Sequence, residues 1–237
     1  MAQVLTHSDD SPHGDNHDNP DYLKDEAYVK HFRVAIFGSA RTEKEDAYYH
    51  QIFDLAKRIG RKGFDVVTGG GPGLMEAANA GHQAGRKDPE VHSIGLTIQL
   101  PWENMPNRNL DVHEHFNRFS ARLDEFLSLS NVAVFTHGGV GTCLEFFYIW
   151  QHVQVRHVTG IPMILIGDMW EGLVEWLKHH PLESGLISPE EFEQLYLVHT
   201  NDQAMALILA AHDQHTKQGE GYKFNFPHFK ALNENPH

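Results

Sequence analysis

The sequence predicts a single α/β domain with a doubly wound, mostly parallel sheet of six to seven strands. Short β-rich runs alternate with segments whose apolar residues recur at helical spacing. The runs themselves are almost continuously apolar, which is typical of parallel strands covered by helices on both faces. The chain has 237 residues and no internal repeat, which suits one domain. These three observations indicate a Rossmann-like fold.

The strands and two of the helices can be placed from local patterns. Six runs are predicted as strands: 33–37, 64–68, 93–98, 131–135, 162–166 and 195–199. A helix is predicted between the first two strands, because five apolar residues recur there at helical spacing: Tyr49, Ile52, Phe53, Ala56 and Ile59. The stretch "SPEE" at 188–191 predicts a helix start, since it combines an N-cap serine, a proline and a glutamate three residues after the cap.

Composition separates this domain from two tails. Residues 1–27 are rich in Asp, Asn, His, Ser and Pro and lack apolar periodicity, so we expect a mobile tail. The Rossmann-like domain is predicted over 28–211. Residues 212–237 are expected to form a polar C-terminal tail, with three aromatic side chains that dock on a neighbouring surface: Phe224, Phe226 and Phe229.

Charge and hydropathy restrict the class of protein. The formal net charge of −13 argues against binding of nucleic acid, although a local phosphate site remains compatible with it. No apolar run approaches the roughly 18 residues of a membrane span, and the N-terminus lacks the regions of a signal peptide. The single cysteine, Cys143, excludes an intramolecular disulfide and agrees with a reducing compartment. We therefore expect a cytoplasmic protein without a membrane partner.

Two glycine-rich loops follow predicted strands at their carboxyl ends, where doubly wound sheets bind ligands. The first is "GGGPG" at 69–73, and the second is "HGGVGT" at 137–142. Glycine lets the backbone approach a ligand closely, and a helix N-terminus offers free N–H groups to a phosphate. One such loop alone is equally compatible with a tight turn. Two on one sheet predict a shared anion site.

The spacing of the two loops excludes the common cofactor fingerprints. Neither fits G-x-G-x-x-G, because Leu74 and Leu144 stand at the third glycine, and no P-loop motif occurs. There is no lysine between Lys87 and Lys178, which argues against a Schiff-base lysine and hence against pyridoxal phosphate. We expect no cofactor.

Taken together, these residues resemble the "lonely guy" family of cytokinin-activating nucleoside 5′-monophosphate phosphoribohydrolases, whose members are often mislabelled lysine decarboxylases. The family's P-G-G-x-G-T-x-x-E pattern is matched after its first position by Gly138, Gly139, Gly141, Thr142 and Glu145. Its G-G-G-x-G-x-M pattern is matched by Gly69, Gly70, Gly71, Gly73 and Met75. Its catalytic arginine precedes the second loop on a helix, where this chain has Arg122. The resemblance spans about 30–210, and the double motif is quite specific.

One position departs from the family pattern. His137 replaces the proline that opens the second motif. A histidine there either fills space or hydrogen-bonds the substrate and alters specificity. Space filling is the preferred interpretation, since a loop does not require proline.

The resemblance implies a reaction and the roles of two residues. The family hydrolyses the N-glycosidic bond of a nucleoside monophosphate, giving free base and ribose 5-phosphate. Glu145 is expected on the first helical turn behind the loop, ionised, where it orients water or stabilises the oxocarbenium-like charge. Arg122 would bind phosphate or ribose and orient Glu145. Without the glycine loops, the two would be interpreted as a helix-start charge and a surface arginine.

The substrate-binding residues are expected around the same loops, and Glu103 and Met75 are equally compatible with an exposed loop acid and a core methionine. The predicted set is Ser39, Gly70, Gly71, Gly73, Met75, Glu103, Gly138, Gly139, Val140, Gly141 and Thr142. The substrate implied is an AMP-like or cytokinin nucleotide. A non-catalytic carrier of a nucleotide or of molybdenum cofactor is the alternative, which His137 keeps open.

Two further expectations concern metals and assembly. His113 and His115 in "HEH" would point the same way only in a strand, and no third ligand is evident, so a solvated loop and no metal site are predicted. Cys143 is interpreted as a small packing residue. The apolar stretch 146–155 predicts a homodimer interface, as is common in the family.

Overall fold

The computed structural model describes residues 31–98, 105–158, 160–219 and 223–232. Its centre is one seven-stranded sheet in the order β4-β3-β2-β1-β5-β6-β7. Each neighbouring pair is parallel. The strands are β1 Arg33–Phe37, β2 Asp65–Thr68, β3 Ser93–Ile98, β4 Val112–Phe116, β5 Val132–Phe135, β6 Met163–Ile166 and β7 Leu195–Val198. The predicted α/β class with a parallel sheet is confirmed.

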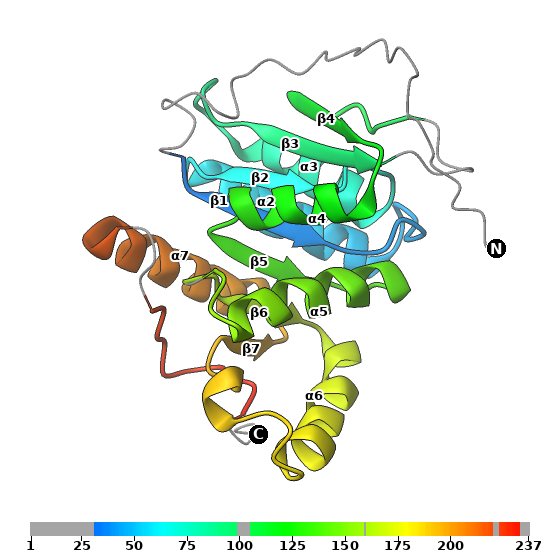
Figure 1. Ribbon diagram of the computed structural model, residues 1–237. Helices are drawn as coiled ribbons and strands as arrows, with labels where there is room; N and C mark the ends of the chain where they lie inside the picture. The colour runs from blue at the N-terminus through cyan, green and yellow to red at the C-terminus, as the bar shows by residue number, and fades with distance from the viewer. Residues whose placement is uncertain (1–30, 99–104, 159, 220–222, 233–237) are drawn as a thin grey trace, which may run out of the picture.

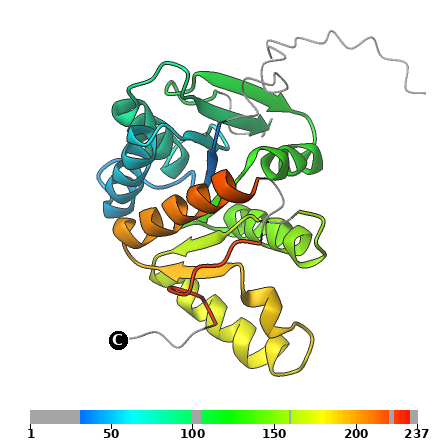
Figure 2. The same cartoon turned by 90° about the vertical axis from the view of Figure 1, so that its left-hand side faces the viewer.

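Helices cover both faces of the sheet, as Figures 1 and 2 show. One layer packs on one face and consists of α2 Ala47–Arg61, α3 Leu74–Gly85 and α7 Asn201–Gln218. The other layer packs on the opposite face and consists of α4 Phe119–Leu129, α5 Val140–Gln154 and α6 Glu171–Leu177. The fold is therefore three-layered, with the sheet in the middle.

Burial on both faces explains the continuous apolar strands. Every residue of β1 is buried. Val34 and Ile36 belong to the core under α2, α3 and α7, whereas Ala35 and Phe37 belong to the core under α4, α5 and α6. Successive strand residues point to opposite faces, so a strand covered twice has no position left for a solvated side chain.

The six predicted strands are confirmed to within one residue at their ends, but the loop predicted around "HEH" is wrong. Residues Val112–Phe116 form β4, which pairs in parallel with β3 at the edge of the sheet. Only the first residue of β4 is fully buried, and the other four are partly or fully exposed. Because one side of this strand is not covered by core, its sequence lacks the apolar run that identified the other strands.

The C-terminal region packs on the domain. Helix α7 begins with a capping box between Thr200 and Gln203 and continues to Gln218, beyond residue 211. The aromatic ring of Phe224 is buried against Tyr196, and a backbone bridge joins Tyr196 to Lys230. The predicted helix start in "SPEE" is a short 3₁₀ helix, Pro189–Phe192, with the expected capping box.

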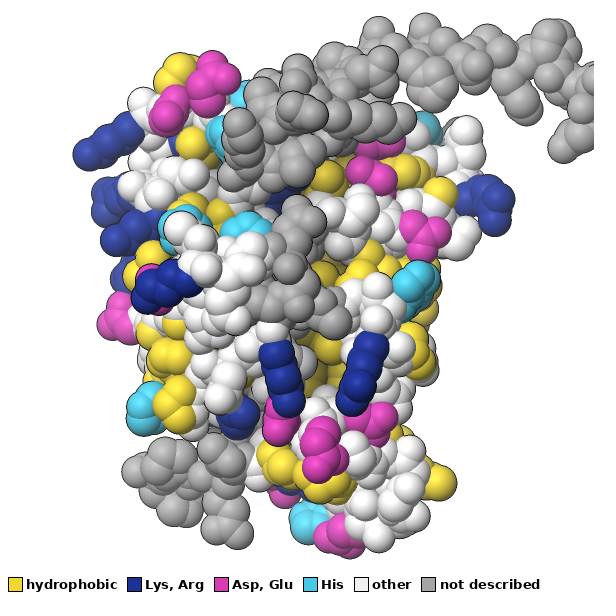
Figure 3. Space-filling model, turned by 60° about the vertical axis from the view of Figure 1, so that its left-hand side comes forward, with side chains coloured by type: hydrophobic (Ala, Val, Ile, Leu, Met, Phe, Trp, Pro, Cys, Tyr) yellow, Lys and Arg dark blue, Asp and Glu magenta, His cyan; other side chains and the backbone are white. Residues whose placement is uncertain are grey.

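The surface carries mixed charge. The face seen in Figure 3 has acidic and basic side chains next to each other between hydrophobic ones. Within the described part of the chain, no helix has both the length and the apolar character needed to cross a membrane.

Candidate active site

The strand order reverses direction between β1 and β5, which are neighbours in the sheet although three strands separate them in the chain. Such a switch point leaves a crevice at the carboxyl ends of the strands. A cavity of about 910 Å³ lies there. Ten of the predicted site residues line it: Ser39, Gly70, Gly71, Met75, Arg122, Gly139, Val140, Gly141, Thr142 and Glu145.

Two predicted site residues within the described part of the chain, Gly73 and Gly138, do not line this cavity. Gly73 lies at the start of α3 with φ +67°, and a side chain there would collide with the carbonyl oxygen of Ser39. Gly138 lies behind the second loop, where a Cβ would collide with the Thr142 side chain. Both glycines thus permit close packing of the loops. Glu103 lies outside the described residues.

The loops that follow β1, β2 and β5 are bonded to one another. The Ser39 N–H donates to the carbonyl of His137 over 2.9 Å, and the Leu74 N–H donates to the carbonyl of Ser39 over 2.9 Å. The Thr136 hydroxyl also donates to the carbonyl of Phe37 over 2.8 Å. Ser39 therefore joins both glycine loops into one backbone frame around the cavity.

Two helices begin at this frame without a capping side chain. Gly73 is the N-cap of α3 and Gly139 is the N-cap of α5, and neither start has a side-chain cap, although the first amide of α3, that of Leu74, donates to Ser39. A Cβ placed on Gly139 or Gly141 would meet no atom within 4 Å, so the α5 start faces open space. Free amides and the positive ends of the helix dipoles make this the natural position for an anion.

A buried polar network holds the first glycine loop in shape. The Asn107 side-chain amide donates to the carbonyls of Gly70 and Gly71 over 3.1 and 3.0 Å, and to the Asn79 side chain over 2.9 Å. The Asn107 N–H also donates to the Gly70 carbonyl over 2.8 Å. Gly70 has φ +70°, a conformation that other residues rarely adopt. Asn107 therefore holds the carbonyls of Gly70 and Gly71 in fixed orientations. Sequence analysis missed it, because a single asparagine carries no local signal.

Arg122 and Glu145 meet in the wall of the cavity. Arg122 comes from α4 and Glu145 from α5, and Nη1 of Arg122 lies 3.3 Å from Oε1 of Glu145. The side chains are only 9% and 13% exposed. The Arg122 Nε–H donates to the carbonyl of Leu96 in β3 over 2.6 Å, which fixes the orientation of the guanidinium. A buried carboxylate beside a fixed guanidinium is the kind of pair that is found at catalytic sites.

The charge state of Glu145 differs from the sequence-based expectation. Burial raises the pKa of its carboxyl to about 7, and the neighbouring Arg122 counteracts only part of that shift. The residue lies in the second turn of α5, which begins at Val140. Since the stabilising effect of a helix dipole falls off within the first turn, it does not keep this carboxyl fully ionised at neutral pH. The expected position in the first turn and the expected full ionisation are both corrected.

His137, which replaces the motif proline, packs against the first layer of helices. Its imidazole stacks on the ring of Tyr48 with 4.3 Å between ring centroids and 12° between planes. Its backbone carbonyl accepts the hydrogen bond from Ser39. The side chain does not line the cavity. This arrangement agrees with the space-filling interpretation.

The histidines of β4 were missed as cavity residues. His113 and His115 both line the cavity, as alternate residues of a strand do when they share a face. The Thr97 hydroxyl lies 2.6 Å from Nε2 of His113 and 3.2 Å from Nδ1 of His115. Burial lowers the pKa of His113, and the neighbouring His115 lowers it further. Their i, i+2 spacing was the available signal, but it is informative only once the segment is known to be a strand.

The family comparison agrees with the glycine loops. The family model described as "Possible lysine decarboxylase" matches residues 75–208, more than half of the chain. The chain belongs to this family. The match covers Arg122 and the whole second glycine motif, and it confirms the resemblance to "lonely guy" proteins drawn from the sequence.

Solved structures share the fold at low sequence identity. The molybdenum cofactor binding protein from Rippkaea orientalis is 19% identical with a TM-score of 0.56, over 76% of this chain and 97% of that one. The molybdenum cofactor carrier protein from Chlamydomonas reinhardtii is 19% identical with a TM-score of 0.56, over 78% and 99%. DNA processing protein A from Helicobacter pylori is 16% identical with a TM-score of 0.50, over 77% and 82%. These likenesses establish the fold alone. No curated protein matches the chain.

Proposed function

We propose that the protein is a nucleoside 5′-monophosphate phosphoribohydrolase acting on AMP-like or cytokinin nucleotides. The observation that carries the proposal is the buried Arg122–Glu145 pair in a cavity that also holds an uncapped helix start. This reaction requires a site that binds the 5′-phosphate of the substrate while a carboxylate faces its glycosidic carbon. The anion site and the carboxylate lie on the same helix, α5, within two turns of each other.

In the proposed reaction, the amides and the Thr142 hydroxyl at the start of α5 bind the 5′-phosphate. Glu145 in its ionised form faces the ribose, stabilises the positive charge that develops as the C1′–N bond breaks, and accepts a proton from the attacking water. The water oxygen bonds to C1′, while the base leaves with the bonding electrons and takes up a proton. Arg122, held by the Leu96 carbonyl, orients the carboxylate and favours its charged form. No resident cofactor takes part.

The test is a direct assay of product release. The full chain is incubated with AMP, GMP, CMP, UMP and isopentenyladenosine monophosphate, and free base and ribose 5-phosphate are measured by chromatography. A matched Glu145→Gln variant removes the charge and keeps the shape. Release by the native protein that disappears in the variant supports the proposal and identifies the preferred base. Tight nucleotide binding without release from any nucleotide contradicts it.

A non-catalytic carrier of a phosphorylated cofactor, such as molybdenum cofactor, is the second candidate. It is favoured by the two solved structures with the same fold that are described as binding or carrying that cofactor. Both candidates use the anion site, but only the hydrolase needs the carboxylate. Cofactor affinity that survives Glu145→Gln, with no nucleotide hydrolysis in either protein, would favour the carrier.

We also propose that the chain forms a homodimer through the α5 face beside the cavity. Large apolar side chains are exposed around this face: Phe119, Val140, Leu144 and Phe147. Val140, at the cavity wall, is 88% exposed. Such a group of exposed apolar residues marks an interaction surface. A Leu144→Glu/Phe147→Glu variant should elute as a monomer in light-scattering chromatography, whereas Trp176→Glu, at an exposed aromatic on α6, should not change the mass.

A further inference from the structure

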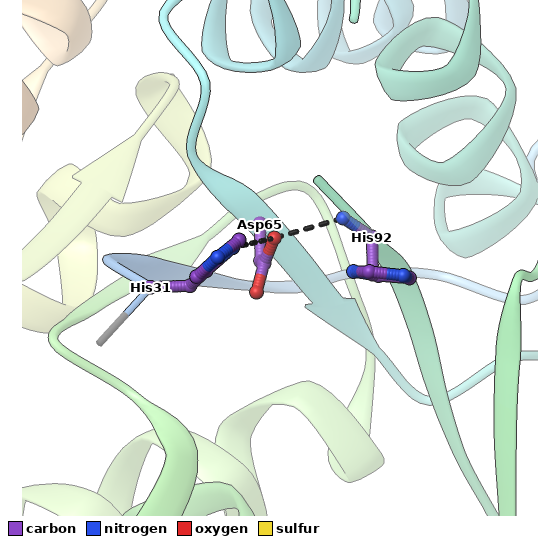
Figure 4. A group of neighbouring side chains, drawn as sticks. All are labelled: His31, Asp65 and His92. Atoms are coloured by element: carbon purple, nitrogen blue, oxygen red, sulfur yellow. Dashed lines mark hydrogen bonds and ion pairs between the residues drawn. The ribbon is translucent and has the colours of Figure 1, made fainter. Parts of the chain in front are cut away.

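A cluster of side chains that could bind a metal lies at the amino ends of the strands, the side of the sheet opposite the cavity. His31 lies two residues before the start of β1, Asp65 is the first residue of β2, and His92 immediately precedes β3. Strands β1, β2 and β3 are neighbours, so parallel pairing brings these three positions together although 34 and 27 residues separate the histidines from Asp65. Figure 4 shows the two histidines on either side of the Asp65 carboxylate.

The potential ligand atoms lie close together, and one pair has the spacing seen in a metal centre. Nδ1 of His31 lies 3.3 Å from Oδ1 of Asp65. One ligand atom from each of the three residues lies within 4.8 Å of the other two. Two ligands at about 2.0–2.2 Å from a tetrahedral ion are themselves roughly 3.3–3.5 Å apart, so the His31–Asp65 pair already has the spacing of a coordination edge. We propose that His31, Asp65 and His92 bind a divalent transition-metal ion of the Zn²⁺ class.

The Asp65 carboxylate is buried and already has one charged partner, Arg33. The side chain of Asp65 is completely buried, and a buried carboxylate requires compensating charge. Oδ1 accepts the backbone N–H of His92 over 2.8 Å, which leaves the imidazole of His92 as the potential ligand. Oδ2 is buried and accepts no hydrogen bond within the described residues, and its contact is an ion pair with Nε of Arg33 at 3.4 Å. Arg33 thus pairs with the carboxylate oxygen that accepts no hydrogen bond, as outer-shell partners of metal ligands do.

The ligand set selects the kind of ion. Two imidazoles and one carboxylate suit Zn²⁺, Ni²⁺ or Co²⁺, whereas Ca²⁺ and Mg²⁺ prefer sites made of oxygen ligands. The charge of Arg33 offsets that of Asp65, so affinity depends on the histidines. The side chain of His31 is 25% exposed, which gives the ion a route from solvent. A bound ion would connect the starts of three adjacent strands and stabilise this edge of the sheet.

A second cluster provides a matched control. Asp168, Glu171 and His199 also bring ligand atoms within 4.8 Å of one another, but both acids are exposed and only one imidazole is present. Solvated carboxylates lose little by remaining unliganded. His199→Gln therefore removes a histidine from a comparable group without touching the proposed centre.

The experiment measures Zn²⁺ binding to the full chain purified without a histidine tag. Calorimetric titration with ZnCl₂ gives the affinity and stoichiometry, and thermal unfolding gives the shift in Tm on saturation. Co²⁺ provides a spectroscopic readout, because a tetrahedral histidine site gives characteristic visible absorption. The variants are His31→Gln, His92→Gln and the control His199→Gln, each checked for folding by circular dichroism. His7, His13 and His17 precede the described residues, so a variant with glutamine at these three positions is included.

We expect one Zn²⁺ per chain and a rise in Tm that scales with RT ln(1 + [Zn²⁺]/Kd). Each of His31→Gln and His92→Gln should weaken this binding by more than about tenfold and reduce the Tm rise. His199→Gln and the triple variant should bind as the native chain does. Three results would overturn the proposal: no Zn²⁺ binding, unchanged affinity in His31→Gln and His92→Gln, or loss of binding only in the control variants.

Discussion

The two edges of the sheet offer opposite chemistry to a ligand. At the carboxyl edge, glycine loops lead into helix starts that lack capping side chains. At the amino edge, the buried Asp65 carboxylate lies between two histidines and accepts the backbone N–H of His92. The proposed anion site and the proposed metal site therefore lie at opposite ends of the strands.

The direction of the helices in a parallel sheet contributes to this difference. Each crossover begins its helix near the carboxyl edge and ends it near the amino edge, so α2 and α3 both end where β2 and β3 begin. A helix start carries partial positive charge and a helix end carries partial negative charge. The helix dipoles alone thus favour anions at the carboxyl ends of the strands and cations at the amino ends. In our proposals, the Arg122–Glu145 pair and the His31–Asp65–His92 cluster then select the ligand at each end.

The largest expected effect is that of Glu145→Gln on turnover. The substitution removes the charge that stabilises the transition state and accepts the proton, and we expect kcat to fall by roughly 10²–10⁴-fold with a small change in KM. Steady-state kinetics with the preferred nucleotide measures it. His92→Gln, at the other edge, should leave kcat unchanged. An equal loss in both variants would show that the two edges are not independent.

The pH dependence of stability gives a sharper test of the Glu145 environment. Its pKa is raised from 4.5 to about 7 by burial, so the folded state binds the proton more tightly than the unfolded state does. The stability contributed by the protonated form is complete below about pH 4.5 and is lost as the pH rises through about 7. Denaturant unfolding at pH 5 and pH 8 measures the difference.

Glu145→Gln should remove this part of the pH dependence while other titrating groups, including His113, keep theirs. The comparison between native and variant protein therefore isolates one carboxyl group. Parallel pH profiles in the two proteins would mean that Glu145 titrates near its ordinary pKa. In that case the carboxyl is ionised at neutral pH, as the sequence-based expectation held.

A smaller effect is expected from a pair of glycine substitutions, one at each edge. Gly141→Ala adds a methyl group where nothing lies within 4 Å, so the fold should tolerate it, but the methyl occupies the anion site. If the methyl group prevents one charge-assisted hydrogen bond between a loop amide and the substrate phosphate, KM should rise by roughly tenfold to a hundredfold. Gly63 lies near the start of β2 and has φ +78°, a conformation that alanine adopts only with strain. Gly63→Ala should therefore lower the free energy of unfolding by about 1–3 kcal/mol and leave KM unchanged.

The reversed outcome would contradict this assignment of roles. If Gly63→Ala raised KM while Gly141→Ala did not, the anion would not bind at the start of α5. Chemical denaturation and steady-state kinetics on both variants decide between these results.

Sequence reasoning recovered the parts of the molecule whose signal is local. Strands such as Arg33–Phe37 are buried on both faces, so their apolar runs identify them directly. The glycine loops are equally visible, because backbone that approaches a ligand or another loop requires glycine in consecutive positions. Arg122 and Glu145 were found through the family pattern that surrounds those glycines.

The remaining features depend on which elements lie side by side. Strand β4 is half-solvated, so no apolar run marks it, and the histidines on it were interpreted as loop residues. Asn107 acts on Gly70 and Gly71 from 37 and 36 residues away. The raised pKa of Glu145 follows from burial, which no local pattern reports. His31, Asp65 and His92 become a cluster only through the order of β1, β2 and β3.

The smallest expected effect is that of restoring the family proline with His137→Pro. The variant loses the stacking of His137 on Tyr48, which is worth about 0.5–1.5 kcal/mol for an aromatic pair, and keeps the carbonyl that accepts from Ser39. We expect a loss of about 1 kcal/mol in the free energy of unfolding and a KM within about threefold of the native value. Tyr48→Leu should cause a similar loss, and the double variant should lose little more than either single one, because both remove the same contact. A change in substrate preference in His137→Pro would instead assign the imidazole to the ligand, and with it a departure from the family's specificity.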